Sequence, residues 1–393
     1  SQKLIDTFFP SPHPEESAWS PMDFYDAAYI PPKDDQEASA IQVPALESTL
    51  FPYQKRTLNW LLAREGAKLN SSVESATSAG GNDFDAFRTV RDADDNEIYV
   101  NDILHTVTRD KSLYQAAHDA MKGGILAEEM GLGKTLEILG LIALHRFSDT
   151  SDLEYRKDAR GLFRTGATLI VSPESLREQW VTEIERHAPT LRVMHYRGCK
   201  KYEGRTEEDI VRELDTYDVI VTTYTVLSQE VHFATAPPER SRRHERVYER
   251  QISPLVKMLW WRVCLDEAQM IESGVTQAAA VARVLPRVNA WAITGTPVKD
   301  DVKDLLGLLQ FLWYQPFCSY TPGWNALIRG HKPVFQQLFR TISLRHTKAL
   351  VRDEIMLPHQ NRYVISMPFS AVEEQHYQSL YKEMAEACGF DLQ

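Results

Sequence analysis

The chain has few cysteines, and their spacing excludes one class of site. Cys199, Cys264, Cys318 and Cys388 are the four in 393 residues, and no two of them form a CxxC pair. Zinc sites of the finger or RING type need such paired ligands. We therefore expect no structural zinc in this segment. Sparse cysteine is also typical of proteins from a reducing compartment.

Long apolar runs are missing as well. No stretch approaches the about 18 consecutive apolar residues that predict a membrane-spanning helix, which disfavours a membrane partner. The first six residues contain neither an initiator Met nor an apolar signal core, as expected of an internal cut rather than a targeting segment. Hydrophobic residues make up 43% and charged residues 25%, the balance of a soluble globular protein with two or three domains.

The charge balance is acidic, with a formal net charge of −11. An acidic chain is on average a poor partner for a polyanion, but a nucleic-acid groove needs only a local basic stripe. Residues 239–250 hold five arginines beside three glutamates. Two readings of this segment stay open: a solvated loop of mixed charge, or a contact with a DNA backbone.

Apolar patterns divide the chain into parts. Residues 1–48, rich in proline and aromatics, predict an extended N-terminal arm that packs on a neighbouring domain. Residues 49–350 alternate short apolar runs with helical patterns, which predicts an α/β fold: a mostly parallel sheet with helices on both faces. Two insertions, at about 68–120 and 228–253, interrupt this pattern. Residues 351–393 follow it.

Five short apolar runs are each followed by polar or turn residues, as in buried strands. They are residues 167–171, 191–196, 218–222, 262–265 and 290–293. Within the first insertion, the low-complexity stretch 71–81 predicts disorder, and residues 89–100, around Asp94-Asp95-Asn96, predict a hairpin.

Residues 123–135 form an apolar strand that runs into a glycine turn ending in Lys134 and Thr135. Such a turn presents backbone N–H groups to a polyphosphate, its lysine reaches the β and γ phosphates, and its hydroxyl binds Mg²⁺. The helical spacing of residues 136–144 places a helix N-terminus at the same anion. The full pattern wants glycine where Glu128 stands. The sequence nevertheless predicts a nucleotide-binding loop that comprises Met130, Gly131, Leu132, Gly133, Lys134 and Thr135.

Two adjacent acids, Asp266 and Glu267, end the run at 262–265. Ligands of open α/β sheets bind beyond the carboxyl ends of the strands, so Asp266 is placed to hold the Mg²⁺ shell and Glu267 to polarise an attacking water. The last run, at 290–293, is followed by Thr294-Gly295-Thr296, which is either a tight turn or part of the same site.

Taken in order, these blocks resemble the first RecA-like lobe of the Snf2 family of helicase-related, DNA-translocating ATPases, over about residues 49 to 380. Leu50 to Gln54 is similar to the family's entry motif, and residues 125–135 to its ATP loop. Residues 168–180 are similar to its motif Ia, and Val221 to Tyr224 to its motif Ib. Asp266 to Gln269 is similar to motif II, and Thr294 to Pro297 to motif III. The stretch Ser253-Pro254-Leu255 and Gln269, where most members have His, resemble the subgroup of Snf2, histone-linker, PHD and RING helicases (SHPRH) and its fungal counterparts.

The resemblance implies roles for these residues. Tyr53 and Gln54 would contact the adenine end of ATP; Gln269, Thr294, Gly295 and Thr296 would couple hydrolysis to movement; Pro173, Glu174, Ser175, Thr222, Thr223 and Tyr224 would touch DNA. ATP and Mg²⁺ are the implied cofactors, duplex DNA or chromatin the partner, the nucleus the location and DNA repair a process. The tail from Leu344 through Leu357-Pro358 to Glu373 resembles the family's brace, and residues 351–393 would form the brace and the start of a linker beyond the lobe. Three residues depart from the pattern: Glu128 replaces an aspartate, His346 the brace's second arginine, and Glu272 a basic residue after motif II.

A second RecA-like lobe is expected as a partner in the full-length chain, because its motifs and its phosphate-stabilising arginine do not occur before Gln393. Such an arginine contributes about 10³ to 10⁵ in rate in related phosphoryl transfers, so this piece alone should hydrolyse ATP poorly. The alternative reading is a chromatin-positioning scaffold of a ubiquitin ligase whose RING lies outside this chain. A metabolic P-loop kinase would leave the Pro173-Glu174-Ser175 and Thr222-Thr223-Tyr224 loops unexplained.

Overall fold

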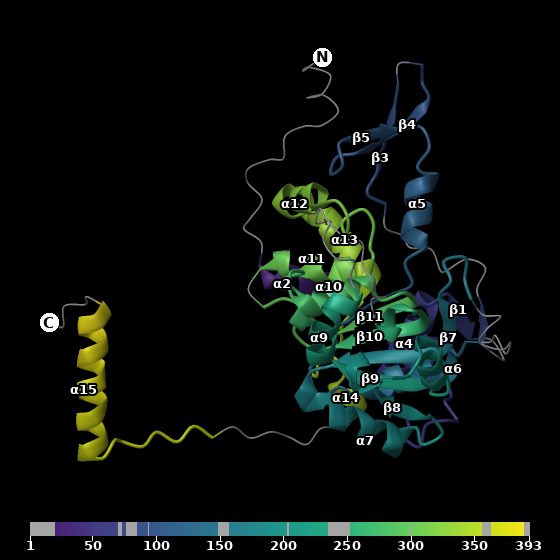
Figure 1. Cartoon of the computed structure of the whole chain (residues 1–393). Coiled ribbons are helices and arrows are strands. Elements are labelled where there is room, and N and C mark those ends of the chain that lie inside the picture. Colours follow the sequence, from purple (N-terminus) through teal and green to yellow (C-terminus); the bar gives the residue numbers. More distant parts are fainter. Residues whose placement is uncertain are drawn as a thin grey trace, which may run out of the picture. The chain divides into compact units, whose positions relative to one another are not determined.

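In the computed structural model, the residues described are 20–69, 73–75, 85–92, 94–147, 157–202, 204–234, 252–299, 301–355 and 363–388. The chain divides into two compact units, Ser1–Ile355 and Met356–Gln393. The first is built on a seven-stranded sheet with the order β12-β6-β11-β10-β7-β9-β8 (Figure 1).

Every neighbouring pair in this sheet is parallel. The five strands expected between residues 167 and 293 are all present, so the predicted α/β fold with a parallel sheet is confirmed. β12 was not predicted, because a two-residue strand leaves no periodic signal. The strands are β6 (Gly123–Leu126), β7 (Phe163–Ser172), β8 (Val193–His195), β9 (Val219–Thr223), β10 (Met258–Asp266), β11 (Arg287–Ile293) and β12 (Ser343–Leu344).

Alternate residues of each strand point to opposite faces of the sheet, and each face has its own core. In β10, Val263 and Leu265 belong to one buried cluster, whereas Cys264 belongs to the other. In β11, Ala292 and Trp291 divide in the same way. The strands are apolar on both sides, as a sheet covered by helices on both faces requires.

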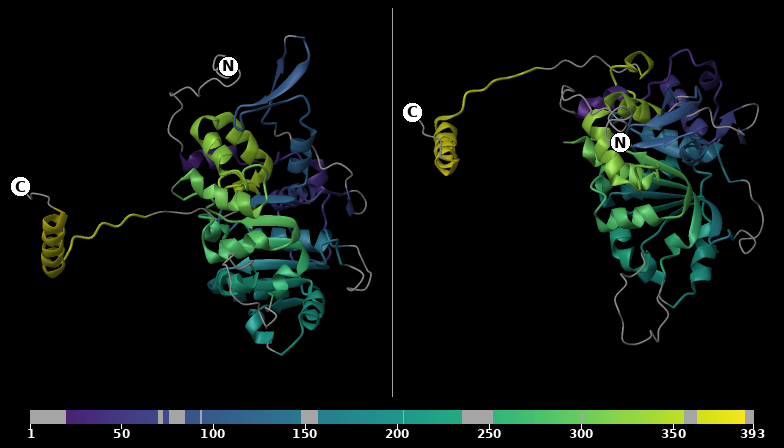
Figure 2. Two further views of the ribbon diagram at one scale, coloured as in Figure 1. Left: turned by 45° about the horizontal axis from the view of Figure 1, so that its top comes forward. Right: turned by 90° about the horizontal axis from the view of Figure 1, so that it is seen from above.

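Helices cover the two faces of the sheet, as predicted, and Figure 2 shows the strands between them. The face that carries Cys264 packs against α4 (Pro52–Arg64), α6 (Lys134–Leu144) and α7 (Arg177–His187). The opposite face packs against α8 (Glu207–Asp215), α9 (Tyr224–Ala234), α10 (Gln277–Val284), α11 (Leu305–Phe311), α12 (Thr321–Gly330) and α13 (Lys332–Ile342).

The described part of the N-terminal arm is not only extended chain, so that prediction needs correction. It contains the helices α2 (Pro21–Ala27) and α3 (Gln36–Ser39). Ser20 and Pro21 start α2: the Asp23 carboxylate accepts the Ser20 backbone N–H at 2.8 Å, and proline suits the first helical position. Phe24 is fully buried and joins the core of the first unit.

The insertions agree with the sequence in part. The predicted hairpin is present as β3 (Arg88–Arg91) and β4 (Glu97–Asn101), extended by β5 (Thr106–Thr108) and followed by α5 (Ser112–Asp119). The stretch expected to be disordered contains β2 (Val73–Ser75), which pairs with β1 (Ala67–Leu69); its remaining residues lie outside those described. The arginine segment at 240–250 also lies outside the described residues, and α9 continues to Ala234.

After α14 (Arg352–Ile355), the second unit contains α15 (Ala371–Cys388). The residues before and along this helix carry exposed apolar side chains, including Ile365, Met367 and Val372. Within the described ranges, no helix is long and apolar enough to cross a membrane.

A buried ion pair fixes α4 to the sheet. Glu65 follows α4 and accepts hydrogen bonds from Arg262 of β10, at 2.5 Å from both Nε and Nη2. His145 Nδ1 lies 2.6 Å from the same carboxylate, and Trp291 Nε1 donates to it at 2.8 Å. Burial alone would raise the pKa of Glu65, but the charge and hydrogen bonds of Arg262 outweigh burial and hold the pKa at about 2.

We expect Glu65→Gln to lower the free energy of unfolding by about 3–5 kcal/mol at pH 7, because it leaves the Arg262 charge buried and unpaired. The folded-state pKa of Glu65 lies below its unfolded value near 4.5, so the stabilisation is complete above pH 4.5 and is lost as the pH falls toward 2. Urea unfolding at several pH values measures this. The difference in unfolding free energy between Glu65→Gln and the wild type should shrink between pH 4.5 and pH 2. The exposed control Glu37→Gln should show no such difference at any pH. A difference for Glu65→Gln that is constant with pH would contradict the assignment.

Candidate nucleotide site

The register of the sheet brings the predicted motifs to one edge. Leu126 of β6 pairs with Ile293 of β11, and Ile293 pairs with Asp266 of β10. The loops that begin at Ala127, Thr294 and Glu267 therefore leave the sheet at the same level. These loops carry the nucleotide-binding residues, the coupling threonines and the acidic pair.

A cavity of about 450 Å³ lies at this edge. Seven of the predicted site residues line it together: Met130, Gly131, Gly133, Lys134, Thr135, Asp266 and Glu267. Leu132 is buried beneath the loop instead, at 1% exposure, and packs with Tyr53 and Val351. The cavity thus combines a glycine loop, a lysine, a hydroxyl and two carboxylates from distant parts of the sequence.

The loop needs its glycines. Gly131 and Gly133 have φ angles of 85° and 84°, in the left-handed region that glycine adopts without strain. A Cβ on Gly133 would lie 2.6 Å from Nε2 of Gln54. Lys134 starts α6, and its ammonium donates to the backbone carbonyl of Glu128 at 2.9 Å. Burial lowers the pKa of Lys134, although the surrounding carboxylates oppose that effect.

Tyr53 and Gln54 contact the loop rather than the lining of the cavity. The Tyr53 hydroxyl and the Gln54 amide both donate to the carbonyl of Leu132, at 2.6 Å and 3.1 Å. The Gln54 carbonyl accepts the backbone N–H of Phe51 at 3.0 Å. Both side chains are buried, and in this structure they stabilise the glycine turn through its Leu132 carbonyl. Their contact with adenine stays a prediction.

The two acids differ in their surroundings. Asp266 is buried, and burial raises its pKa even though Trp180 Nε1 donates to Oδ2 at 2.7 Å. Glu267 is a non-glycine residue with a φ of 49°, a backbone conformation that is uncommon and clusters at functional sites. Its carboxylate accepts Nε2 of Gln269 at 2.7 Å.

The coupling residues form a continuous chain from the acid. Gln269 binds Glu267 through its Nε2 and accepts the Thr294 hydroxyl through its Oε1, at 2.6 Å. The same hydroxyl accepts the backbone N–H of Thr296 at 3.1 Å. Gly295 lies close to the loop, since a Cβ there would be 2.9 Å from Cγ of Met130. The predicted coupling set is therefore contiguous with the predicted catalytic acid.

The predicted DNA-contact residues separate into two groups. Pro173, Glu174 and Ser175 form the surface turn that opens η2 (Glu174–Leu176), and the last two are exposed. Thr222, Thr223 and Tyr224 are buried. Their hydroxyls bond within the unit: Thr222 donates to the Tyr196 carbonyl, Thr223 accepts the Val226 N–H, and Tyr224 donates to the Asp266 carbonyl at 2.8 Å. These three side chains therefore fix the end of β9 beside Asp266, and contact between this loop and DNA stays a prediction.

The sequence analysis included α7 only up to Trp180, in the block similar to motif Ia, and gave no role to the rest of the helix. Trp180, Glu183 and His187 line the cavity from one face of α7, at helical spacing, and Leu176 lines it from the turn before the helix. That spacing was a signal, but only the position of α7 beside β10 shows what it faces. Glu137, one turn after Lys134, was also missed. Burial and the nearby Glu128 carboxylate raise its pKa well above the ordinary value, which favours the neutral acid.

No group of three or more His, Cys, Asp or Glu side chains in the described ranges is arranged to hold a metal ion. Thr135 and Asp266 stay the predicted protein ligands of a bound Mg²⁺, whose other ligands would come from phosphate and water, as is usual for this ion. The buried Asp266 carboxylate and the glycine cradle fit such a group.

The chain matches the SNF2-related domain over residues 53–389, so it belongs to the SNF2-related family. The resemblance read from its motifs is confirmed.

Several relatives share this segment. The chain is 29% identical to the ATP-dependent helicase IRC20 of Saccharomyces cerevisiae, over 89% of this chain and 26% of that protein. It is 38% identical to the E3 ubiquitin-protein ligase SHPRH of Homo sapiens, over 54% and 13%, and 30% identical to the DNA repair protein RAD5A of Arabidopsis thaliana, over 85% and 34%. Among solved structures it is similar to the Sulfolobus solfataricus SWI2/SNF2 ATPase core in complex with dsDNA, with a TM-score of 0.47 and 20% identity, over 80% of this chain and 48% of that one. The chain spans about a third or less of the curated relatives named here.

We expect Gly133→Ala to weaken nucleotide binding at least about tenfold, because the added Cβ meets Gln54 and the backbone is left-handed there. Titration with a fluorescent ATP analogue and Mg²⁺ measures the affinity. Gly204→Ala is the matched control, since Gly204 has a φ of 82° with open space around its Cβ position. The control should lower the thermal midpoint slightly and leave the affinity unchanged. Equal losses in both variants would mean that general backbone strain, rather than the loop, is responsible.

Proposed function

We propose that this chain is the ATP-binding lobe of a DNA translocase that couples ATP hydrolysis to movement on duplex DNA, acting in DNA repair on nuclear chromatin. The observation that carries the proposal is the convergence of Lys134, Asp266 and Glu267 on one cavity. The relatives support it, because they include an ATP-dependent helicase and a DNA repair protein.

Each residue of the cavity has a role in this proposal. Lys134 exchanges its bond to the Glu128 carbonyl for the β and γ phosphates, and Thr135 and Asp266 would hold Mg²⁺. The metal ion would neutralise phosphate charge. Glu267 accepts the proton of the attacking water, and Gln269 keeps its carboxylate oriented.

Coupling follows from the hydrogen-bonded chain that begins at Glu267. Any change in the charge or position of this carboxylate alters its bond to Gln269 and so the bond from Thr294. Tyr224, bonded to the Asp266 carbonyl, ties the end of β9 to the same acid pair. We infer that the Tyr224 path carries the hydrolytic state toward β9 and its neighbour β7, and so to the Pro173–Ser175 turn, whereas the Thr294 path carries it to the end of β11.

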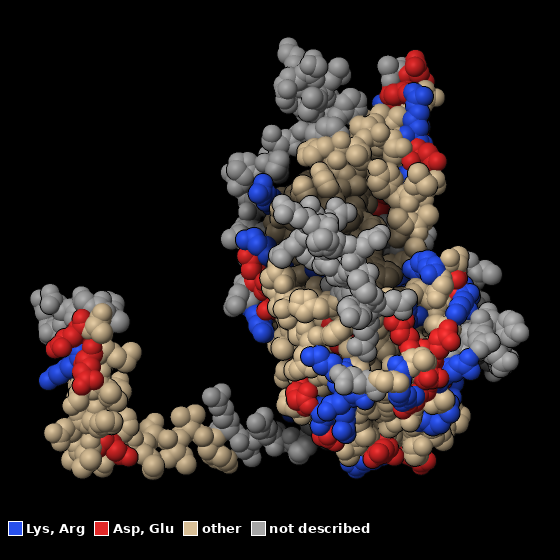
Figure 3. Space-filling model, viewed as in Figure 1, with Lys and Arg blue, Asp and Glu red and all other residues tan. Residues whose placement is uncertain are grey.

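DNA contact falls to the Pro173–Ser175 turn in this proposal, because its side chains reach the surface. Figure 3 shows Lys and Arg interspersed with Asp and Glu around α7 and β8, so that face carries charges of both signs despite the net charge of −11. The arginines at 240–250 keep both of their readings.

The second lobe belongs to the proposal as a partner. Without its arginine, the lobe described here should bind ATP and turn it over nearly not at all. One alternative rests on the similarity to SHPRH, which is named as an E3 ubiquitin-protein ligase. In that case the lobe would position chromatin for ubiquitin transfer, and its ATP turnover would be dispensable.

We expect Lys134→Ala to abolish nucleotide binding, because the phosphates lose their cation. Glu267→Gln should keep MgATP affinity and stop turnover, because an amide cannot accept the proton of the attacking water. Affinity is measured on this chain and DNA-stimulated turnover on the full-length protein, with the thermal midpoint as a folding control. Unchanged turnover in Lys134→Ala would refute the motor proposal, and loss of binding in Glu267→Gln would refute the role given to that acid.

Duplex DNA should bind this chain weakly, with an affinity that falls steeply with salt. We expect Ser175→Glu to weaken binding about three- to tenfold at low salt, because it adds a negative charge beside the phosphates. Ser39→Glu, the same change at another exposed serine, is the control and should have little effect. Fluorescence anisotropy over a salt series measures both. Replacing the five arginines at 240–250 by serine tests whether the insertion contributes to DNA binding. If that change removes most of the dependence of the DNA affinity on salt, the contact lies in the insertion instead.

A further inference from the structure

Glu128 and His346 form a buried pair that joins the nucleotide loop to the residues after β12. The two residues are 0% and 1% exposed. His346 Nδ1 lies 2.7 Å from Oε1 of Glu128, and the His346 backbone N–H donates to Oε2 at 2.5 Å. Thr57 Oγ1 donates to Oε1 at 2.9 Å. His346 thus supplies two of the three contacts that hold this carboxylate.

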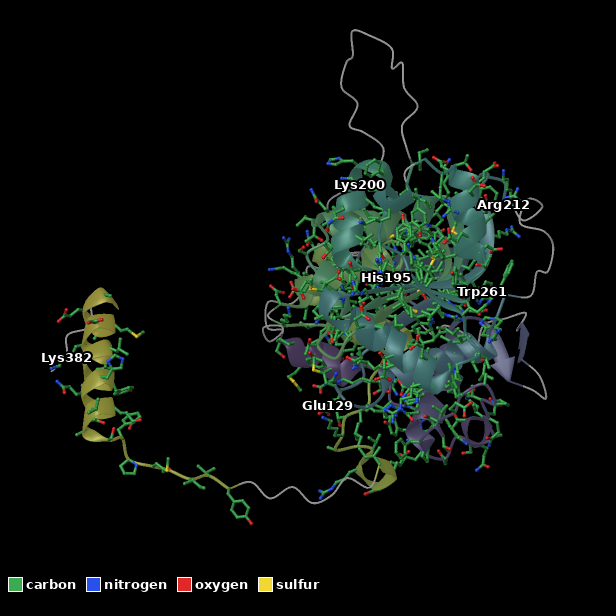
Figure 4. The ribbon with its side chains drawn as sticks, turned by 60° about the horizontal axis from the view of Figure 1, so that its bottom comes forward. Glu129, His195, Lys200, Arg212, Trp261 and Lys382 are labelled. Atoms are coloured by element: carbon green, nitrogen blue, oxygen red, sulfur yellow. The ribbon has the colours of Figure 1, made fainter. Side chains whose placement is uncertain are left out.

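The chain around His346 runs alongside the start of the loop. Ala127 N–H donates to the Leu344 carbonyl at 2.8 Å, and Glu129 N–H donates to the His346 carbonyl at 3.1 Å. The Lys348 N–H in turn donates to the Glu129 carboxylate at 2.8 Å. Figure 4 labels Glu129 at this edge of the unit. Residues 127–129 are therefore held on one side by residues 344–348.

Glu128 also contacts Lys134, the lysine of the nucleotide loop. Its backbone carbonyl accepts the Lys134 ammonium at 2.9 Å, while its side chain is held by His346. The position of one residue therefore sets both contacts. A shift of the Glu128 carboxylate moves the carbonyl that Lys134 uses.

We propose that His346 is a positioning residue for the nucleotide loop: through Glu128 it fixes where Lys134 rests, and thereby sets the affinity for nucleotide. The inference rests on the proposed function in that it takes the cavity to be a nucleotide site. Shortening the carboxylate at position 128 by one methylene would open its contact with residue 346, and a longer cationic side chain at position 346 would close it again. Changes at the two positions should therefore compensate each other only when made together.

The test is a double-mutant cycle with Glu128→Asp, His346→Arg and the double variant, read as the Kd of a fluorescent ATP analogue with Mg²⁺. Each single change should raise the Kd about tenfold, and the double variant should return to within about threefold of the wild type. His346→Asn keeps a donor near the position of Nδ1 and should stay close to wild type, whereas His346→Leu should not. These two variants keep the test open if His346→Arg does not fold.

A matched control exists in the same chain. His145 and Glu65 form a second buried histidine–carboxylate pair, at 2.6 Å, at the other end of α6. His145→Gln should lower the thermal midpoint and leave the Kd within about twofold of wild type. If both histidine changes altered stability alone, His346 would have only a structural role and the proposal would be overturned.

Amide hydrogen exchange in the nucleotide-free chain separates this inference from the proposed function. Exchange over residues 127–135 should quicken in Glu128→Asp and His346→Arg, slow again in the double variant and stay unchanged in His145→Gln. A wild-type chain that binds no analogue refutes the nucleotide site, whereas unchanged exchange, or Kd losses that simply add in the double variant, refute the role of His346.

Discussion

The parallel pairing of β6, β11 and β10 is the constraint on which the site depends. Leu126, Ile293 and Asp266 are register partners, and a one-residue slip between any two strands would reverse which face each side chain meets. Both faces are closed by helices, so a slip would also push polar residues into two cores. The strict register explains how residues from distant parts of the sequence meet at one cavity, where hydrogen bonds such as those from Thr294 to Gln269 and from Tyr224 to Asp266 then join the motifs.

The same edge gathers side chains whose burial favours a charged ligand. Burial lowers the pKa of Lys134 and raises that of Asp266, so both groups are less stable as ions than they would be in water. Phosphate beside the lysine and a divalent cation beside the aspartate would each offset that penalty. The buried charges of the cavity therefore match those of a nucleotide and its metal ion, with anionic phosphate beside Lys134 and a cation beside Asp266.

Much of this arrangement could be predicted from the sequence, because its signals are local. Apolar runs with sharp polar ends identified five strands, and the glycines of the loop are required by left-handed backbone at Gly131 and Gly133. What the sequence missed depends on pairing over long distances. The burial of Thr222 to Tyr224, the cavity-facing side of α7 and the bond between Glu128 and His346 each follow from which segments pack together. A single sequence, read without aligned relatives, does not show which segments pack together.

α6 is anchored at both ends, by Lys134 at the loop and by His145 at the Glu65–Arg262 pair. A helix held at both ends in this way cannot slide along its axis. A displacement of its first turn would therefore be passed to the buried Glu65–Arg262 pair at its other end. Because residues 344–348 also hold residues 127–129, α6 links a firmly held nucleotide loop to the buried Glu65–Arg262 pair.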